Sequence, residues 1–213
     1  MPLALFNDLI RAKQLFEPIE PGNVKFYCCG PTVYDYFHIG NARPFIVFDS
    51  LRRYLEFLGY KVTYVQNFTD IDDKMISRAS QLGISVPELA HRFIEAYYED
   101  AEALGIRPPS VSPLATDFMP EIIALVEHLI EKGHAYVVEG DVYFEVMSFP
   151  EYGNLAKQSL DELLSGARIE VDARKRHPLD FALWKTKKAD EPSWKSPWGE
   201  GRPGCISNAA PCP

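Results

Sequence analysis

The sequence predicts an α/β fold that begins with a parallel strand–helix–strand unit and continues into a smaller α+β part. An apolar run at 24–30, closed by Gly-Pro, and a β-branched and aromatic run at 61–66 flank a segment of helical periodicity. Units of this kind build parallel sheets with right-handed crossovers. After residue 110, a helical segment followed by two alternating runs predicts the α+β part.

The composition is that of an ordinary globular protein. Of the 213 residues, 46% are apolar and 24% are charged. We expect a cytoplasmic protein without a membrane partner, because no apolar run is long enough to span a bilayer and the first residues lack the features of a secretion signal. The net charge of −8 argues against binding DNA through bulk charge. Four cysteines are too few for a disulfide framework and favour reduced thiols or metal ligands.

Three helices are expected in the first half of the chain. The first follows the loop 31–37 and is stopped by Gly59, with apolar residues at three- and four-residue spacing. The second ends at about Leu82 before Gly83, and the third opens on a capping box at 85–88. The apolar faces of the first and third helices are formed by Phe45, Phe48, Leu51, Leu55 and Leu58, and by Leu89, Phe93, Ala96, Tyr97 and Leu104.

The second half begins at the Pro108-Pro109 segment, which breaks the helical pattern and predicts a boundary. A helix from Pro120 to about Gly133 and a hairpin over 134–147 follow, and we expect a short helix at 159–164. The stretch 185–203 shows no periodicity. Tryptophans among lysines can form a nucleic-acid surface, but a packed irregular loop is the favoured interpretation. These tryptophans are Trp184, Trp194 and Trp198.

The junction between the first strand and the first helix is the candidate site. The phosphate-binding loops of P-loop and dinucleotide-binding proteins are absent from the sequence. Ligands of open α/β sheets bind at the carboxyl ends of strands, and a helix N-terminus there offers free N–H groups to a phosphate. Gly40 allows a nucleotide to approach the backbone, and His38 and Asn41 can donate hydrogen bonds to phosphate oxygens. The alternative for His38 is a helix cap or a packed side chain.

Two further groups of residues have metal-binding and structural interpretations. Cys29, at a strand end, is either a zinc thiolate or a small buried residue, whereas Cys28 should point to the opposite face and be buried. Asp70, Asp72 and Asp73 do not match the spacing of a calcium loop. We expect them to favour the N-terminus of the second helix, with Asp70 as its cap.

Several long segments together resemble the amino-terminal half of the cysteinyl-tRNA synthetases, which are class I aminoacyl-tRNA synthetases. The resemblance covers residues 5–204. Its motifs are FYCCGPTVYD at 26–35, HIGNAR at 38–43, NFTDIDDK at 67–74, GAR at 166–168, DFALWK at 180–185, and PSW with SPWG and GRPG at 192–204.

The resemblance implies an enzyme that activates L-cysteine with ATP to cysteinyl-adenylate and transfers it to tRNA(Cys), acting as a monomer. It implies that residues 1–109 form the first half of a Rossmann-type catalytic domain that binds ATP and cysteine. Residues 110–204 would be a connective-domain insertion and the return toward the catalytic domain.

The resemblance also assigns site residues. His38 and Asn41 match the ends of the HIGH signature, with Asn41 in place of the last histidine, and are the implied catalytic residues. Cys29 matches a ligand of a catalytic zinc that holds the substrate thiolate, which allows serine to be rejected. Cys29 and Thr69 would contact cysteine, and Mg²⁺ would accompany ATP. The implied ATP-binding residues are Pro31, Thr32, His38, Gly40, Asn41 and Arg43.

Two alternatives remain beside this interpretation. The cysteine ligase of mycothiol synthesis shares the scaffold, although Arg43 and the Thr-Val-Tyr at 32–34 are more similar to the tRNA synthetases. A non-catalytic module that binds a nucleotide or a partner protein is the other alternative.

The resemblance stops after Gly204. The family pattern continues Trp-His-Ile-Glu-Cys-Ser-Ala-Met-Ser, whereas this chain reads CISNAAPCP. Deleting one base from one possible coding of the family peptide reproduces all nine of these residues. We therefore expect 205–213 to be an out-of-frame tail in which Cys205 and Cys212 are not zinc ligands. With the other zinc ligands beyond the break, this chain is expected to be inactive by itself.

Overall fold

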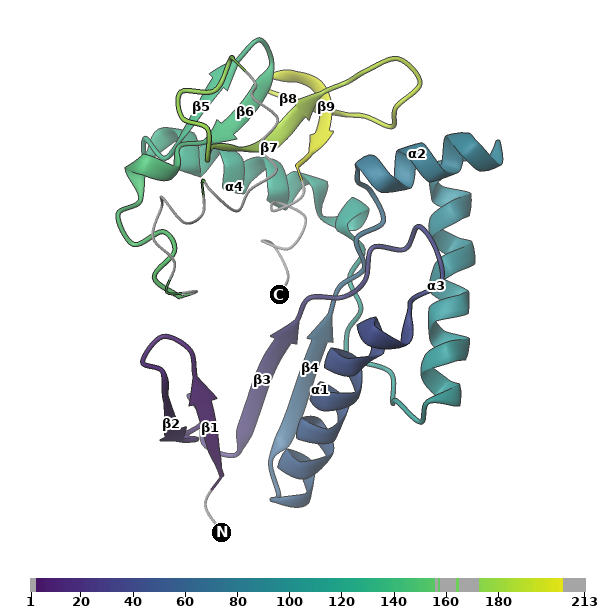
Figure 1. The fold of residues 1–213 in the computed structure, drawn as a ribbon, viewed down its shortest axis with the longest axis vertical. Helices are drawn as coiled ribbons and strands as arrows, with labels where there is room; N and C mark the ends of the chain where they lie inside the picture. Colours follow the sequence, from purple (N-terminus) through teal and green to yellow (C-terminus); the bar gives the residue numbers. More distant parts are fainter. Residues whose placement is uncertain (1–2, 156, 158–163, 165–172, 205–213) are drawn as a thin grey trace.

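A computed structural model describes residues 3–155, 157, 164 and 173–204 of the chain (Figure 1). The tail 205–213, the GAR motif at 166–168 and almost all of the helix expected at 159–164 lie outside these described residues. The predicted α/β class is confirmed, because a parallel strand pair is joined to a separate antiparallel sheet. Among the described helices, none is long and apolar enough to cross a membrane.

The first part contains the parallel pair and the helices packed near it. A hairpin of two exposed strands, which the sequence analysis did not predict, precedes them. The elements are β1 (Ala4–Asn7), β2 (Ala12–Leu15), β3 (Asn23–Cys28), α1 (Ile39–Phe57), β4 (Lys61–Gln66), α2 (Asp73–Leu82) and α3 (Val86–Ala103).

The second part is an antiparallel sheet with strand order β5-β6-β7-β9-β8, and α4 packs against it (Figure 1). Its elements are η1 (Ala115–Phe118), α4 (Met119–Glu131), β5 (Ala135–Val138), β6 (Asp141–Phe144), η2 (Val146–Ser148), β7 (Phe181–Thr186), β8 (Trp194–Ser196) and β9 (Gly199–Pro203). The predicted hairpin is confirmed as β5–β6, whose turn residues Glu139 and Gly140 both have positive φ.

The strand–helix–strand prediction is confirmed by the register of β3 and β4. The two strands pair in parallel from Asn23 opposite Lys61 to Cys28 opposite Gln66. The chain after Pro108-Pro109 then returns along β4, where Gln66 N–H donates to the Val111 carbonyl at 3.1 Å. The division into residues 1–109 and 110–204 stays a prediction.

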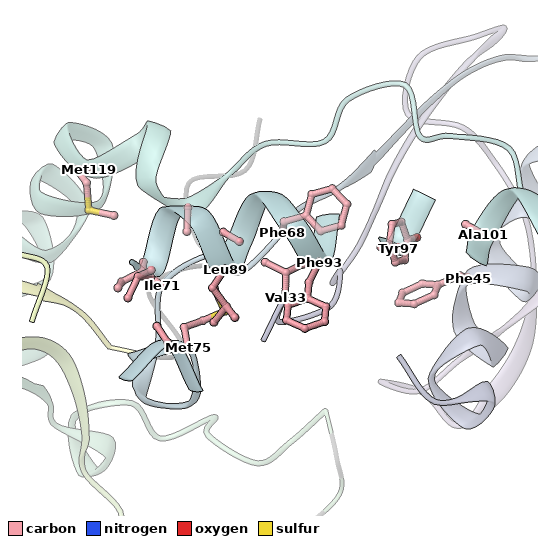
Figure 2. Packing of buried hydrophobic residues seen from close by; sticks show 14 of the residues in the cluster. Val33, Phe45, Phe68, Ile71, Met75, Leu89, Phe93, Tyr97, Ala101 and Met119 are labelled. Carbon is pink, nitrogen blue, oxygen red and sulfur yellow. The ribbon is translucent and has the colours of Figure 1, made fainter. Parts of the chain in front are cut away.

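A single hydrophobic cluster fills the space around α2 and α3 (Figure 2). Phe45 of α1 and Phe68 make edge contacts with the ring of Tyr97, at centroid distances of 5.4 and 5.1 Å. The phenol of Tyr97 accepts a hydrogen bond from the buried side chain of Gln66 at 2.8 Å. Burial raises the pKa of Tyr97 to about 12, so its hydroxyl stays neutral. The cluster continues past residue 109 to Ile122 in α4.

The prediction that Asp70 caps α2 is wrong. The cap is Asp72, whose side chain accepts from Met75 N–H at 2.7 Å. Asp70 is buried and binds Thr116 instead, accepting from its backbone N–H at 3.1 Å and from its hydroxyl at 2.6 Å. Burial raises the pKa of Asp70 and outweighs these hydrogen bonds. Spacing within 70–73 could not reveal this partner, because Thr116 is 46 residues away.

The prediction of an irregular loop over 185–203 is also wrong. The segment forms the end of β7 and the strands β8 and β9. β8 has only three residues, and β9 contains two glycines and a proline, so neither strand alternates over enough residues to be recognised. The packing part of the prediction is confirmed for Trp184, which is fully buried and contacts Trp198 edge-on at 5.9 Å.

The carboxyl ends of β3 and β4 meet in a contact that only glycine permits. A Cβ atom on Gly30 would lie 1.6 Å from the carbonyl oxygen of Asn67. The Asn67 side-chain oxygen accepts from Gly30 N–H at 3.0 Å and from the Tyr27 hydroxyl at 2.8 Å. The segment after β4 also binds the loop after β3, since Thr69 N–H donates to the Pro31 carbonyl at 3.1 Å. This contact fixes the start of the loop that leads to α1.

An ionic clamp joins the antiparallel sheet to the first turn of α2. Arg202 of β9 is 2% exposed and binds Asp73 of α2 and Glu191, the latter at 3.1 Å. Lys185 of β7 binds the second oxygen of Asp73 at 2.6 Å. Burial opposes ionisation of Asp73, but these two cations outweigh it and hold its pKa below the usual value. The clamp therefore binds Asp73 in its ionised form.

Replacing Gly30 with alanine should destabilise the fold strongly. Because the new Cβ meets backbone rather than a movable side chain, we expect a loss of at least about 3 kcal/mol in the free energy of unfolding. Urea denaturation measures this loss. Gly83→Ala is the control: it has open space but a φ of +65°, and should cost only about 1 kcal/mol. Equal losses in the two variants would contradict the close-contact argument.

Removing the buried guanidinium should break the clamp. Arg202→Met leaves Glu191, which is only 12% exposed, without its cation, and we expect a loss of about 2–4 kcal/mol on urea denaturation. Lys187→Met removes an exposed ion pair with Glu200 and should cost less than about 1 kcal/mol. A clamp that contributes nothing would give the same small loss in both variants.

The clamp also predicts a dependence of stability on pH. Because the pKa of Asp73 is lowered in the folded chain, its stabilisation is present above the unfolded value of about 4. It is lost as the pH falls through the lower, folded value. Stability should therefore decline less steeply below pH 4 in Asp73→Asn than in the unaltered chain, in urea titrations between pH 3 and 6. Gly83→Ala, which removes no titratable group, should keep the unaltered slope.

Candidate active site

A cavity of about 390 Å³ opens at the carboxyl ends of β3 and β4, where the sequence predicts the site. Three segments line it: the loop after β3, the first turns of α1, and the start of α2. The predicted site residues among the lining are Cys29, Pro31, Thr32, Gly40 and Asn41.

His38 caps α1 through one of its two ring nitrogens. Its Nδ1 accepts a hydrogen bond from Gly40 N–H at 3.0 Å, so in the neutral ring the proton resides on Nε2. The ring is exposed, and Nε2–H remains able to donate to a ligand. The capping alternative for His38 is therefore confirmed, and it leaves the second nitrogen for chemistry.

The first turn of α1 combines bound N–H groups with a carbonyl that lacks its helical donor. Two of its first N–H groups are bound by His38, since Gly40 N–H donates to Nδ1 and Asn41 N–H donates to the His38 carbonyl at 2.7 Å. Pro44 lies inside the helix and lines the same cavity, and it lacks the N–H that would bind the Gly40 carbonyl. No acidic side chain lies in this first turn. The turn therefore presents no opposing carboxylate of its own to an anion, and the side chain of Asn41 is a donor that lines the cavity.

The two adjacent cysteines face different surroundings, as predicted from strand alternation. Cys28 is buried, and burial raises the pKa of its thiol. Cys29 is exposed and lines the cavity. The exposed thiol is the one that a metal or a substrate can reach, which removes the buried-residue alternative for Cys29. Among the described residues, no group of three or more His, Cys, Asp or Glu side chains is placed to hold a metal ion.

Three predicted residues lie beside the cavity rather than in its lining. Thr69 is almost fully buried beneath the loop, where its carbonyl accepts from Val33 N–H at 3.2 Å. Arg43 is exposed in the first turns of α1. His38 caps the helix at the edge of the cavity. Their roles toward a ligand stay predictions.

Sequence reasoning missed the lining residues Tyr34, Asp35 and Lys74. Asp35 is paired with Arg78 of α2 at 3.2 Å, and the ammonium of Lys74 lies 5.4 Å from the centroid of the Tyr34 ring. A signal was present in the sequence: Lys74 is a cation in the first turn of a helix, where the helix dipole disfavours positive charge.

A larger depression of about 810 Å³ lies at the β1–β2 hairpin, but its described lining residues include no cation that could bind an anionic ligand. Its lining includes the carboxylates Asp8 and Glu17 and is otherwise neutral, with Leu5, Phe6 and Leu15 among its apolar side chains. Acidic groups repel phosphate and carboxylate ligands. We therefore place the candidate site at the strand ends.

Similarity to known proteins extends over almost the whole chain. The family model described as "tRNA synthetases class I (C) catalytic domain" matches residues 15–209. A cysteine–tRNA ligase of Symbiobacterium thermophilum is 61% identical over 96% of this chain, and one of Caldicellulosiruptor saccharolyticus is 58% identical over 95%. This chain spans 44% and 43% of their lengths.

A solved LeuRS–tRNA–LeuAMS complex from Agrobacterium radiobacter K84 aligns with 62% of this chain and 18% of its own, at 22% identity and a TM-score of 0.48. That likeness is too distant for its site to be compared with this one. The match of the family model covers most of the chain and includes every residue that lines the cavity. The chain belongs to the family of class I (C) tRNA synthetase catalytic domains.

Proposed function

We propose that this chain provides the ATP- and cysteine-binding part of a cysteine–tRNA ligase. The reaction would join L-cysteine to the α-phosphate of ATP, release pyrophosphate, and pass the cysteinyl group to tRNA(Cys). The relatives at 58–61% identity carry that name, and their similarity extends over almost the whole of this chain. We further propose that the protein works as a monomer in the cytoplasm, where tRNA is charged.

The observation that carries the proposal is that Gly40 and Asn41, which end the segment 38–41, line the cavity. Asn41 lines the cavity, while the neutral His38 ring has its proton on Nε2. Both side chains can donate hydrogen bonds to phosphate oxygens, whose negative charge grows as pyrophosphate leaves. Pro31, Thr32 and Gly40 would border the nucleotide, and Arg43 would add positive charge from the exposed side of α1.

Cys29 and Thr69 would define the amino-acid end of the site. The exposed Cys29 thiol is at the end of β3, and Thr69 supports the loop 31–33 from below. A substrate cysteine between them would present its carboxylate toward the first turn of α1. The carboxylate would then lie on the same side of the cavity as the phosphates that it must attack.

A zinc ion is implied by the resemblance, but the described residues do not complete a site for it. Zinc in catalytic sites takes about three protein ligands, and here Cys29 is one candidate donor with no metal-binding group around it in the described part of the chain. We propose Cys29 as one ligand and derive no step through the ion. Magnesium would accompany ATP by neutralising phosphate charge.

A chimera tests the proposed activity. Residues 1–204 would replace the aligned segment of the Symbiobacterium thermophilum relative, and pyrophosphate exchange into ATP would be measured with cysteine and with serine. We expect exchange with cysteine and not with serine. His38→Ser keeps a capping acceptor for Gly40 N–H but removes the Nε2 donor, so it should slow exchange about 100-fold.

The control is His91→Ala, which removes an exposed histidine of α3 paired with Glu95 and should leave the rate unchanged. An inactive chimera beside an active unaltered relative would contradict the proposal. So would a full rate in His38→Ser. Exchange with cysteine but no charging of tRNA(Cys) would favour a cysteine ligase that acts on another acceptor.

A further inference from the structure

We propose that Lys74 binds the phosphates of the nucleotide from the side of the cavity opposite α1. The inference rests on the proposed function, which places ATP in this cavity. Lys74 lies in the first turn of α2 and lines the cavity together with Gly40 and Asn41 of α1. Two separate elements would thus hold one ligand.

The ammonium of Lys74 has no carboxylate among its contacts in the described part of the chain. Its nearest described interaction is with the ring of Tyr34, at 5.4 Å from the centroid. The neighbouring Asp73 does not form an ion pair with Lys74, because one of its oxygens binds Lys185 and the other binds Arg202. By contrast, Lys25, Lys185 and Lys187 each form an ion pair with a carboxylate.

The position of Lys74 is unfavourable for the helix itself. The first turn of α2 is the positive end of the helix dipole, where a cation raises the free energy of the folded chain. A residue that opposes its local structure is typical of a site kept for function. An anion bound in the cavity would remove the conflict, since it would offset both the ammonium and the helix end.

The charges around the cavity leave a local excess of positive charge. Asp35 is the carboxylate in its lining, and Arg78 neutralises it at 3.2 Å from one turn farther along α2. Lys74 is therefore the uncompensated charge of the described lining, although the chain as a whole carries −8. A positive lining in a chain of negative net charge favours a strongly anionic ligand in this cavity.

Among the anions of the proposed reaction, the triphosphate fits best. A lysine ammonium is a compact point charge with three donors, which suits the several oxygens of a polyphosphate. The substrate carboxylate carries only a single negative charge. The side chain of Asn41, in the first turn of α1, would bind the same phosphates, and Lys74 would bind them from α2.

The ionic clamp of the antiparallel sheet positions Lys74. Asp73 immediately precedes Lys74 in the chain, and both of its carboxylate oxygens bind cations from β7 and β9. Asp72 caps the same turn through Met75 N–H. The backbone of Lys74 is thus anchored on both sides, and only its side chain is free to reach into the cavity.

Calorimetric titration of the full 213-residue chain tests the proposal, with ATP, inorganic tripolyphosphate and adenosine as separate probes. Lys74→Met should weaken ATP and tripolyphosphate binding by about 10- to 100-fold, as expected for a lost charge-assisted hydrogen bond. Adenosine binding should not change. Lys74→Arg keeps the charge and should retain most of the affinity. The thermal midpoint of Lys74→Met should not fall, because the variant removes a cation from the positive end of a helix.

Lys61→Met is the matched control, because Lys61 is an exposed lysine at the opposite end of the same strand pair. It should bind all three probes like the unaltered chain. Equal weakening of adenosine and ATP in Lys74→Met would overturn the proposal in favour of a structural role. Unchanged ATP binding in Lys74→Met, or an unaltered chain that binds neither ATP nor tripolyphosphate, would also overturn it.

The outcome is separable from that of the proposed function. If Lys74 controls polyphosphate binding but the chimera shows no exchange with cysteine, the anion site stands and the proposed function fails. If the chimera is active and Lys74→Met binds ATP normally, the proposed function stands and the role of Lys74 fails.

Discussion

The close contact of Gly30 with Asn67 is the constraint on which the site depends. Parallel strands can end at the same edge of a sheet without their following loops touching. Here the absence of a Cβ on Gly30 lets the two backbones meet, and the Asn67 side chain bonds across the gap to Gly30 N–H and the Tyr27 hydroxyl. The loop after β3 is thereby held against the chain after β4. The cavity forms where this loop turns into α1.

A second constraint acts from outside the parallel pair. Arg202 and Lys185 of the antiparallel sheet hold Asp73, and Trp194 of β8 packs against the hydrophobic cluster around α2 and α3. The first turn of α2 is therefore set by residues more than 100 positions away in the chain. Because α2 supplies one wall of the cavity, the antiparallel sheet contributes to the site without lining it. This arrangement makes the second part of the chain a support for the first.

The features that the sequence predicted well are those set by local pattern. The strands at 24–30 and 61–66, the helix between them and the capping box at Ser85 all follow from neighbouring residues, and the structure confirms them. Alternation along β3 also separated buried Cys28 from exposed Cys29. The failures involve distant partners or short strands. Asp70 binds Thr116 rather than its own helix. β8 is too short, and β9 too rich in Gly and Pro, to show alternation.

For His38, the structural and functional interpretations are compatible. From the sequence, a histidine before a helix either caps it or binds a ligand, and the two uses look like alternatives. The geometry removes the choice, because capping engages Nδ1 and places the proton on Nε2. A serine or asparagine would cap as well but would extend a shorter donor toward the cavity. The cap also orients the ring, so the start of α1 fixes the direction of the imidazole donor. A histidine at this position therefore both caps the helix and offers a donor to a ligand. A smaller capping residue would need a neighbouring side chain to supply that donor.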